Sequence, residues 1–243
     1  MNRDIKAIFI DTGNTMRIVK QDSVFQLAAM EQIAKLVGVQ ESPQAFFNLL
    51  DQRYEAYKKW ARETLLQVSE IEMWTRWMLP EYPAAKISSL AENLTQLWLQ
   101  RGGRRVPRPE VKPTIIELSQ RGYTLGIIAN SLSTTEIPLW LKEDGLAKYF
   151  KSVVLSSNFG RRKPDPYIYL EAARLAGVEP AHCAYVGDNP SRDIAGARQA
   201  GFGMVIILLE RETLDKETPR GKDKPDGIIG QFSELLNLFF ARN

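Results

Sequence analysis

The pattern of apolar and polar positions divides the chain into two kinds of segment. Residues 7–10 are continuously apolar and end at Asp11, as in a strand that is buried on both faces. Similar runs predict further strands at 123–130, 152–157, 183–188, 203–209 and 227–229. Amphipathic segments between them predict helices at 109–122, 133–145, 165–177, 191–201 and 231–240. This alternation predicts an α/β fold, a doubly wound parallel sheet with a Rossmann-like core.

The segment between residues 23 and 100 has a different pattern, because its apolar positions recur at helical spacing and glycine is almost absent. It predicts helices at 23–39, 44–65, 69–80 and 88–100. Since the strand at 7–10 must join the later strands, this helical block is an insertion. We therefore expect residues 1–15 and 106–243 to form the core and residues 16–105 to form an all-helical cap domain.

Composition excludes several classes of protein. The 243 residues are 44% hydrophobic, which supports a large core, and the net charge of +3 is too balanced to indicate nucleic-acid binding. No run reaches the roughly 18 apolar residues of a membrane span. The one cysteine, Cys183, excludes an internal disulfide and a multi-cysteine metal site. We expect a soluble, cytoplasmic protein without a membrane partner, with a solvated charged loop at 210–224; the oligomeric state stays undetermined.

Candidate chemistry gathers in GDNPSRD at residues 187–193, between a predicted strand and a predicted helix. Asp188 and Asp193 thus follow the carboxyl end of a strand, where open α/β sheets bind ligands. Hard carboxylate oxygens in this position suit Mg²⁺ better than zinc or copper. For Asp193 a second interpretation also holds, because an aspartate in the first turn of a helix is favoured by the helix dipole.

Two further motifs, FIDTGNT at 9–15 and KPDP at 163–166, complete a set with GDNPSRD. Together they resemble the haloacid dehalogenase-like hydrolase superfamily, most of whose members are Mg²⁺-dependent phosphatases. The resemblance covers nearly the whole chain and also implies a cap inserted after the first strand. It implies that Asp11 is the nucleophile that forms an aspartyl-phosphate, and that Lys163 binds the phosphate and offsets charge repulsion.

The resemblance also implies a metal site and a phosphate-binding loop. The metal ligands are expected to be Asp11, the backbone carbonyl of Gly13, Asp188 and Asp193. The family places its phosphate-binding loop where the second strand of the core closes, which here is at Asn130 and Ser131. The implied cofactor is Mg²⁺ and the implied partner is a small phosphorylated substrate.

Two positions depart from the family pattern. The family phosphatases carry a second aspartate two residues after the first, which protonates the leaving group and then activates water; that position is Gly13. General acid–base help is typically worth about 10²–10⁴ in rate. The family serine or threonine that donates a hydrogen bond to the phosphoryl group is replaced by Ala129. Backbone amides, Asn130 or Ser131 are candidates to replace that donor in part.

The sequence leaves more than one function open. The first hypothesis is a Mg²⁺-dependent hydrolase of a small phosphorylated metabolite, which without the acid favours good leaving groups such as acyl phosphates, anhydrides and aryl phosphates. The second is a catalytically impaired, regulatory protein that binds a phosphorylated ligand or a protein partner. A weaker third is a phosphonatase-like C–P hydrolase, which needs a cap lysine for a Schiff base; Lys20 and Lys35 are candidates.

The predicted cap carries features that are less specific. Its tryptophans are expected to pack between helices rather than to line a substrate pocket: Trp60, Trp74, Trp77 and Trp98. The stretch RGGRRVPRP at 101–109 returns the chain from cap to core. Its arginines either meet an anionic substrate at the domain cleft or belong to a solvated linker.

Overall fold

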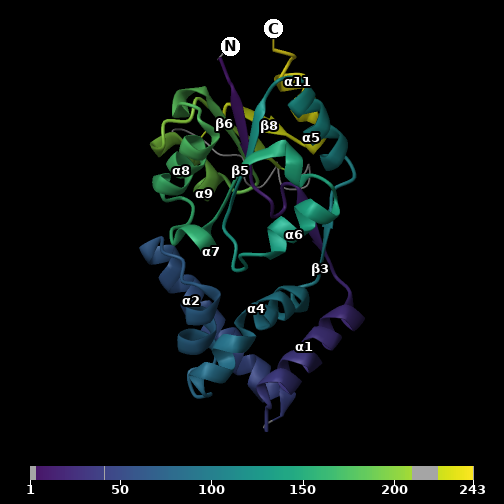
Figure 1. Ribbon diagram of the computed structural model, residues 1–243, viewed down its shortest axis with the longest axis vertical. Helices are drawn as coiled ribbons and strands as arrows, with labels where there is room; N and C mark the ends of the chain where they lie inside the picture. The colour runs from purple at the N-terminus through teal and green to yellow at the C-terminus, as the bar shows by residue number, and fades with distance from the viewer. Residues whose placement is uncertain (1–3, 41, 210–223, 243) are drawn as a thin grey trace.

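The computed structural model describes residues 4–40, 42–209 and 224–242. Figure 1 shows a sheet with covering helices in the upper part of the molecule and a group of helices in the lower part. The charged loop predicted at 210–224 lies outside the described residues, apart from Lys224. Among the described helices, none has both the length and the apolarity that crossing a membrane requires.

The upper part is built on a six-stranded sheet in which all neighbours are parallel. Its strand order is β5 (Phe150–Leu155), β4 (Thr124–Ala129), β1 (Ala7–Ile10), β6 (Cys183–Gly187), β7 (Met204–Leu208) and β8 (Gly227–Ile229). After β1 the chain builds one side of the sheet through β4 and β5, and it then returns to build the other side. The predicted doubly wound parallel sheet is therefore confirmed.

The alternation of side chains along β1 creates the two faces of this sheet. Ile8 and Ile10 point to a cluster shared with α5 (Val111–Gln120), α6 (Glu136–Glu143) and α11 (Leu235–Leu238). Ala7 and Phe9 point to a second cluster, shared with α8 (Pro166–Ala176) and α9 (Pro190–Gln199). All four β1 side chains are fully buried, as a continuous apolar run predicts.

The lower part is a helical domain with its own apolar core. Its elements are α1 (Ser23–Val37), α2 (Pro43–Thr64), the single turn α3 (Glu70–Glu72), a π-helical segment (Met73–Met78) and α4 (Ala84–Arg101). The four predicted tryptophans pack here: Trp74 and Trp98 are buried, and Trp60 and Trp77 lie against the cluster. The prediction that they serve helix packing is confirmed.

A short two-stranded ribbon connects the two parts, and the pattern of the sequence did not predict it. Strand β2 (Arg17–Lys20) pairs antiparallel with β3 (Arg104–Pro107), with Ile18 opposite Val106. The helical block thus begins and ends at this ribbon, and residues 104–107 of the returning stretch form a strand whose ends, Arg104 and Pro107, are exposed. Both strands are short and rich in charge, so pairing across more than 80 residues outweighs local propensity here. The division at residues 15 and 106 stays a prediction; β2 begins just inside the first boundary, and β3 crosses the second.

Three predicted elements differ in detail. The segment at 231–240 forms a 3₁₀ turn (Phe232–Glu234) and the short α11 instead of one helix. The helix predicted at 69–80 becomes π-helical after one turn. The strand predicted at 152–157 ends at Leu155, and the short helix α7 (Ser156–Phe159) begins at once. Element boundaries depend on tertiary contacts that a periodic pattern does not contain.

Candidate active site

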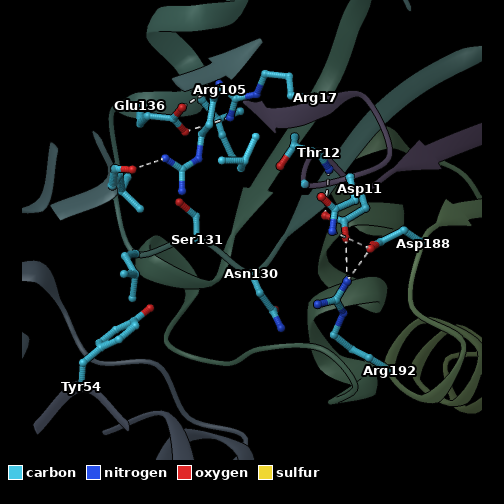
Figure 2. A pocket seen from close by; sticks show the side chains of 16 residues that line it. Asp11, Thr12, Arg17, Tyr54, Arg105, Asn130, Ser131, Glu136, Asp188 and Arg192 are labelled. Carbon is cyan, nitrogen blue, oxygen red and sulfur yellow. Dashed lines mark hydrogen bonds and ion pairs between the residues drawn. The ribbon is translucent and has the colours of Figure 1, made fainter. Parts of the chain in front are cut away.

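The carboxyl ends of neighbouring strands bring the predicted site residues together. Asp11 follows β1, Asn130 follows β4 and Asp188 follows β6, and these three strands are adjacent in the sheet. The backbone N–H of Asp11 donates to the carbonyl of Val186 at 2.9 Å, which joins the two strands at the point where they end. Figure 2 shows these side chains facing one cavity. This is the edge where open α/β sheets bind ligands.

Lys163 reaches the same place from the loop before α8, and its side chain is fully buried. Its ammonium nitrogen lies 2.8 Å from Oδ2 of Asp11 and 3.2 Å from Oδ1 of Asp193. It also donates to the hydroxyl of Tyr185 at 2.5 Å. A buried ammonium group is costly unless it is paired, so these three contacts account for its position.

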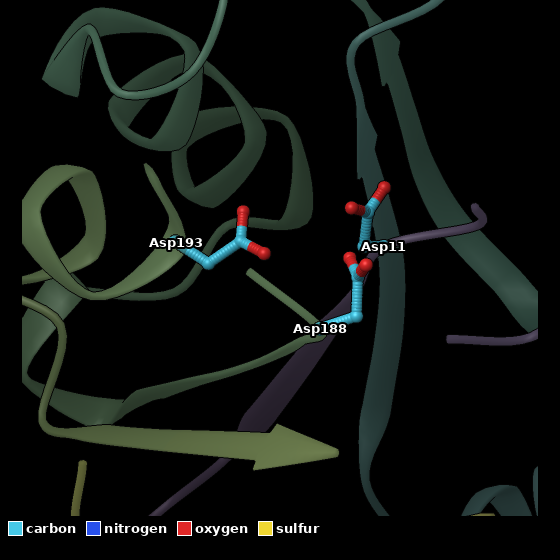
Figure 3. Close-up of side chains that lie close together, drawn as sticks. All are labelled: Asp11, Asp188 and Asp193. Atoms are coloured by element: carbon cyan, nitrogen blue, oxygen red, sulfur yellow. The ribbon is translucent and has the colours of Figure 1, made fainter. Parts of the chain in front are cut away.

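Three carboxylates form the acidic part of the site (Figure 3): one oxygen from each of Asp11, Asp188 and Asp193 can be chosen so that all lie within 4.8 Å of one another. Asp193 is fully buried in the first turn of α9, and its Oδ2 accepts the N–H of Asn189 at 3.0 Å. Both interpretations of Asp193 therefore find support in its position. Asp188 is the most accessible of the three, and Asn14 donates to its Oδ2 at 3.2 Å.

Arg192 lies in the centre of these carboxylates, and sequence reasoning did not select it. Its Nη2 donates to Asp11 at 2.8 Å, to Asp188 at 3.2 Å and to Asp193 at 3.3 Å. The sequence could have indicated it, because GDNPSRD places this arginine directly before Asp193 in the first turn of a predicted helix. Tyr185, the hydroxyl partner of Lys163, was missed as well, since it reads as an ordinary strand residue.

These contacts shift the titration of the acids in opposite directions. Burial, followed by the negative charge of Asp11, raises the pKa of Asp188 to about 6. Burial also disfavours the ionised form of Asp193, but the charges of Lys163 and Arg192 outweigh it and lower the pKa of Asp193 to about 2. For Arg192, burial is outweighed by Asp193 and Asp11, so its pKa is raised above the usual range.

The donor set fits Mg²⁺, which prefers carboxylate and carbonyl oxygens. The carbonyl oxygen of Gly13 accepts the N–H of Thr15 at 2.6 Å and keeps a second lone pair for a ligand. The three carboxylates are close enough to share one cation. The residues that could hold Mg²⁺ are therefore those implied by the resemblance, and Arg192 shares their oxygens.

A cavity of about 330 Å³ opens in front of Asp11. The sheet edge contributes Asp11, Gly13, Asn130, Ser131 and Asp188 to its lining. The ribbon, α6 and the helical domain close the other end with Arg17, Arg105, Glu136, Tyr54 and Leu99. Arg105 belongs to the stretch 101–109, so one of its arginines faces the cavity, as the first alternative predicted. Lys20 and Lys35 are exposed and are not among its lining residues, so the phosphonatase hypothesis lacks its cap lysine.

The two residues predicted to bind phosphate line the cavity, but their side chains are engaged. The amide nitrogen of Asn130 donates to the carbonyl of Lys163 at 3.0 Å, and the N–H of Lys163 donates to Oδ1 of Asn130 at 2.8 Å. Ser131 donates its hydroxyl to the carbonyl of Ser133 at 2.7 Å. Asn130 thus positions the lysine loop, and phosphate binding by either residue stays a prediction.

The two positions that depart from the family pattern, Gly13 and Ala129, differ in whether they line the cavity. A Cβ atom added at Gly13 would meet nothing within 4 Å, so a side chain has room to enter the cavity. Ala129, by contrast, is buried at the end of β4 and is not among the residues that line the cavity. The missing acid could therefore be restored at Gly13 without steric conflict.

Known proteins resemble this chain in sequence and in fold. A family model described as haloacid dehalogenase-like hydrolase matches residues 5–201. The chain is 28% identical over 258 residues to a phosphoserine phosphatase of Thermus thermophilus, covering 96% of this chain and 98% of that protein. It is 38% identical over 135 residues to a glyceraldehyde 3-phosphate phosphatase of Methanopyrus kandleri, which spans 54% of this chain and 56% of that enzyme, about half of each.

Two solved structures share the fold over nearly the full length. A 2-haloacid dehalogenase from Pseudomonas syringae pv. Tomato DC3000 has a TM-score of 0.69 at 24% identity, covering 96% of this chain and 97% of that one. A HAD phosphatase from Thermococcus onnurineus has a TM-score of 0.65 at 23% identity, covering 98% and 99%. At these identities the likeness concerns the fold alone.

Proposed function

Because the chain belongs to the haloacid dehalogenase-like hydrolase family, we propose that it is a phosphatase in which Asp11 attacks the phosphorus of a small phosphorylated metabolite. Family membership confirms the prediction of a hydrolase, whereas the phosphatase activity, the metal and the covalent intermediate are what we propose. One observation carries the proposal: the Asp11 carboxylate stands at the sheet edge, paired with the buried ammonium of Lys163 at 2.8 Å, and faces a cavity.

The relatives support the class of substrate. A phosphoserine phosphatase matches over nearly its whole length, and a glyceraldehyde 3-phosphate phosphatase matches over about half of its length. Both act on small molecules that carry a phosphate, as their names state. The cavity of about 330 Å³ is of a size for such a molecule.

The chemistry follows from how the Asp11 oxygens are held. Oδ2 receives both Lys163 and Arg192, whereas Oδ1 accepts the N–H of Thr12 at 2.7 Å. Oδ1 is therefore the oxygen that we assign to the attack. As it bonds to phosphorus, the bond to the leaving oxygen breaks and that oxygen departs with the electron pair. Water then attacks the phosphorus of the aspartyl-phosphate. The bond between phosphorus and Oδ1 breaks, its electron pair returns to the Asp11 carboxylate, and a proton of the water passes to solvent, which leaves inorganic phosphate.

Cations stabilise the charge that the phosphoryl group develops during transfer. Lys163 supplies one charge next to Asp11. Mg²⁺, when held by Asp11, the Gly13 carbonyl, Asp188 and Asp193, supplies electrostatic stabilisation of the phosphoryl oxygens. Tyr185 and Asn130 keep Lys163 in place, through its ammonium and its backbone respectively.

The absence of an acid at Gly13 sets the preferred leaving group. An acyl phosphate, an anhydride or an aryl phosphate releases an oxygen that needs no proton, so such a substrate tolerates a glycine. A simple alkyl phosphate releases a poor leaving group. Its hydrolysis therefore lacks the rate enhancement of about 10²–10⁴ that a general acid supplies. We therefore propose a bias toward acidic leaving groups.

The test is hydrolysis of 4-nitrophenyl phosphate with MgCl₂ by the wild type and by Asp11→Asn, followed by acid quench and mass spectrometry of the peptide that contains residue 11. The expected result is turnover by the wild type, a phosphorylated Asp11 in the quenched sample, and neither in the variant. Turnover that persists in Asp11→Asn would contradict the proposal.

A second candidate is a member that binds a phosphorylated ligand or a protein partner without turnover. Gly13 favours it, because the proton-transfer group of the family is absent. It predicts no hydrolysis of aryl or acyl phosphates but measurable binding of a phosphate ligand, and wild-type turnover of 4-nitrophenyl phosphate would rule it out.

A further inference from the structure

Arg105 occupies an unusual electrostatic position at the end of the cavity away from the sheet. Its Nη1 donates to the carbonyl of Leu99 at 2.7 Å, and no described carboxylate forms an ion pair with it. The acid at this end of the cavity, Glu136, is held by Arg17 through both oxygens, at 2.6 and 2.9 Å. Arg17 in turn stacks over the ring of Trp140 at 4.3 Å.

The charges at this end do not balance. Two guanidinium groups face one carboxylate, so one positive charge remains beside a partly enclosed cavity. Burial lowers the pKa of the Arg105 guanidinium more than the nearby charge of Glu136 raises it. A poorly hydrated cation that faces a cavity gains most from an anionic ligand.

We propose that Arg105 and Tyr54 bind a second anionic group of the substrate, a carboxylate or a second phosphate, while the first phosphate lies at Asp11. The proposal rests on the function proposed above. Both side chains line the same cavity as Asp11, and they come from the ribbon and from α2 (Figure 2). Burial raises the pKa of the Tyr54 hydroxyl, so it remains a donor near neutral pH. The substrate is thus a phosphorylated compound with an anionic group at its far end.

The test uses ligands that cannot be hydrolysed, so that it does not depend on turnover. Calorimetry with MgCl₂ measures the Kd of 4-carboxybenzylphosphonate and of its neutral amide, 4-carbamoylbenzylphosphonate. Since a hydrogen-bonded charge pair is worth about 1.5–3 kcal/mol, we expect the wild type to bind the carboxylate at least about 10-fold more tightly. A third ligand, 4-xylylenebisphosphonate, tells whether carboxylate or phosphate is preferred at the far end.

Variants locate the preference. Arg105→Ala is expected to bring the ratio of the two Kd values close to one, and Arg105→Lys to keep part of it. Arg104→Ala is the matched control, because its guanidinium pairs with Asp22 and is half exposed; it should keep the wild-type ratio. Equal Kd values in the wild type, or a ratio that survives in Arg105→Ala, would overturn the proposal. If the wild type prefers the carboxylate ligand as expected but does not hydrolyse 4-carboxyphenyl phosphate, the phosphatase proposal fails while the assignment of Arg105 stands.

An independent observation concerns Arg192. Its Nη2 lies within 3.3 Å of an oxygen of each carboxylate that could hold Mg²⁺. Counted by formal charge, three carboxylates with Lys163 and Arg192 carry one net negative charge, and without Arg192 they would carry two. We infer that Arg192 is a built-in cation that competes with divalent metal for these carboxylates. Its side chain is 28% exposed, so it has a path outward when metal binds.

The test measures metal binding alone, with Mn²⁺ followed by electron paramagnetic resonance. Arg192→Ala and the neutral, hydrogen-bonding Arg192→Gln should both bind Mn²⁺ at least about 10-fold more tightly than the wild type, since each removes a competing charge. Arg198→Ala is the matched control on the same helix, where its guanidinium pairs with Asp226, and should leave the affinity unchanged. The inference would be overturned if Arg192→Gln bound Mn²⁺ with the same affinity as the wild type or more weakly. Arg192→Gln keeps more of the side-chain volume, so it serves as the test if Arg192→Ala fails to fold.

Discussion

The sheet edge and the helical domain are stabilised by opposite means. At the sheet edge, ionisable groups hold one another; Asp11, Lys163 and Asp193 are buried, and Asp188 and Arg192 are partly exposed. The interior of the helical domain is mainly aromatic and aliphatic, and a hydrogen bond from Trp74 to Thr95 lies within it. Burying a charge is costly unless its partners are present, whereas an apolar core tolerates substitutions that conserve its volume.

This contrast teaches where function is vulnerable. One substitution at the sheet edge leaves a buried charge without its partner, so it affects both chemistry and folding. A substitution in the helical interior changes stability but leaves the Asp11 geometry alone. The cavity lies between the two regions, and its far end is where the helical domain and the ribbon can influence the choice of substrate. Substitutions in each region therefore test this division of roles.

The largest effect is expected for Asp11→Asn, which keeps the size of the side chain but removes the nucleophile. Turnover of 4-nitrophenyl phosphate should fall at least about 10³-fold, as for other nucleophile deletions. Asp51→Asn in the helical domain is the control, because its carboxylate pairs with Arg101 far from the sheet edge. A comparable loss in Asp51→Asn would break the contrast between the regions.

The next effect is a gain. Gly13→Asp places an acid where a side chain has room, and it should raise kcat for an alkyl phosphate by about 10²–10⁴. The gain should be much smaller for 4-nitrophenyl phosphate, whose leaving group needs no proton. Gly13→Asn has the same size without the proton and should show no gain. An equal gain in both variants would mean that shape, not proton transfer, limits the wild type.

A smaller effect concerns the pH dependence of folding without metal. Because the pKa of Asp188 is raised to about 6, the folded protein binds more protons than the unfolded chain between pH about 4 and 6. The free energy of unfolding should therefore fall as pH rises through this window, by up to about 3 kcal/mol for a shift of about two pKa units. Urea unfolding in EDTA at several pH values measures it.

Asp188→Asn removes the titrating group, so the fall across about pH 4 to 6 should become shallower in that variant. Asp51→Asn should keep the wild-type slope. If Asp188→Asn has the same slope as the wild type, another group causes the pH dependence, and the carboxylate of Asp188 does not control stability in this range.

The smallest effect is expected in the helical domain. Thr95→Val removes the acceptor of the buried Trp74 indole N–H, which lies 2.8 Å away, and should lower the free energy of unfolding by about 1–3 kcal/mol. The partly exposed Thr75→Val should change it by less than about 0.5 kcal/mol. Neither should alter kcat for 4-nitrophenyl phosphate. A fall in kcat in Thr95→Val at a temperature where it is folded would show that the helical interior controls the chemistry.

Sequence reasoning reached the parallel sheet and the motif acids because both depend on local pattern. Asp11 and Asp188 each follow an apolar run, Lys163 opens a proline-rich turn, and parallel strands place their carboxyl ends at one edge. The structure brings these residues together, while their catalytic and metal-binding roles stay predictions. The sequence does not indicate that the side-chain amide of Asn130 hydrogen-bonds the backbone of Lys163, because the two residues are 33 positions apart.

By itself, the sequence determined that the chain folds as a parallel sheet with a helical insertion, because apolar periodicity and motif spacing are local properties of the chain. Only the tertiary structure decided that β2 pairs with β3, that Arg192 lies among three carboxylates, and that Arg105 faces the cavity while Glu136 is held by Arg17. These arrangements depend on which charges share a buried space. Coulomb energy acts through distance in three dimensions, so separation along the chain does not reveal it.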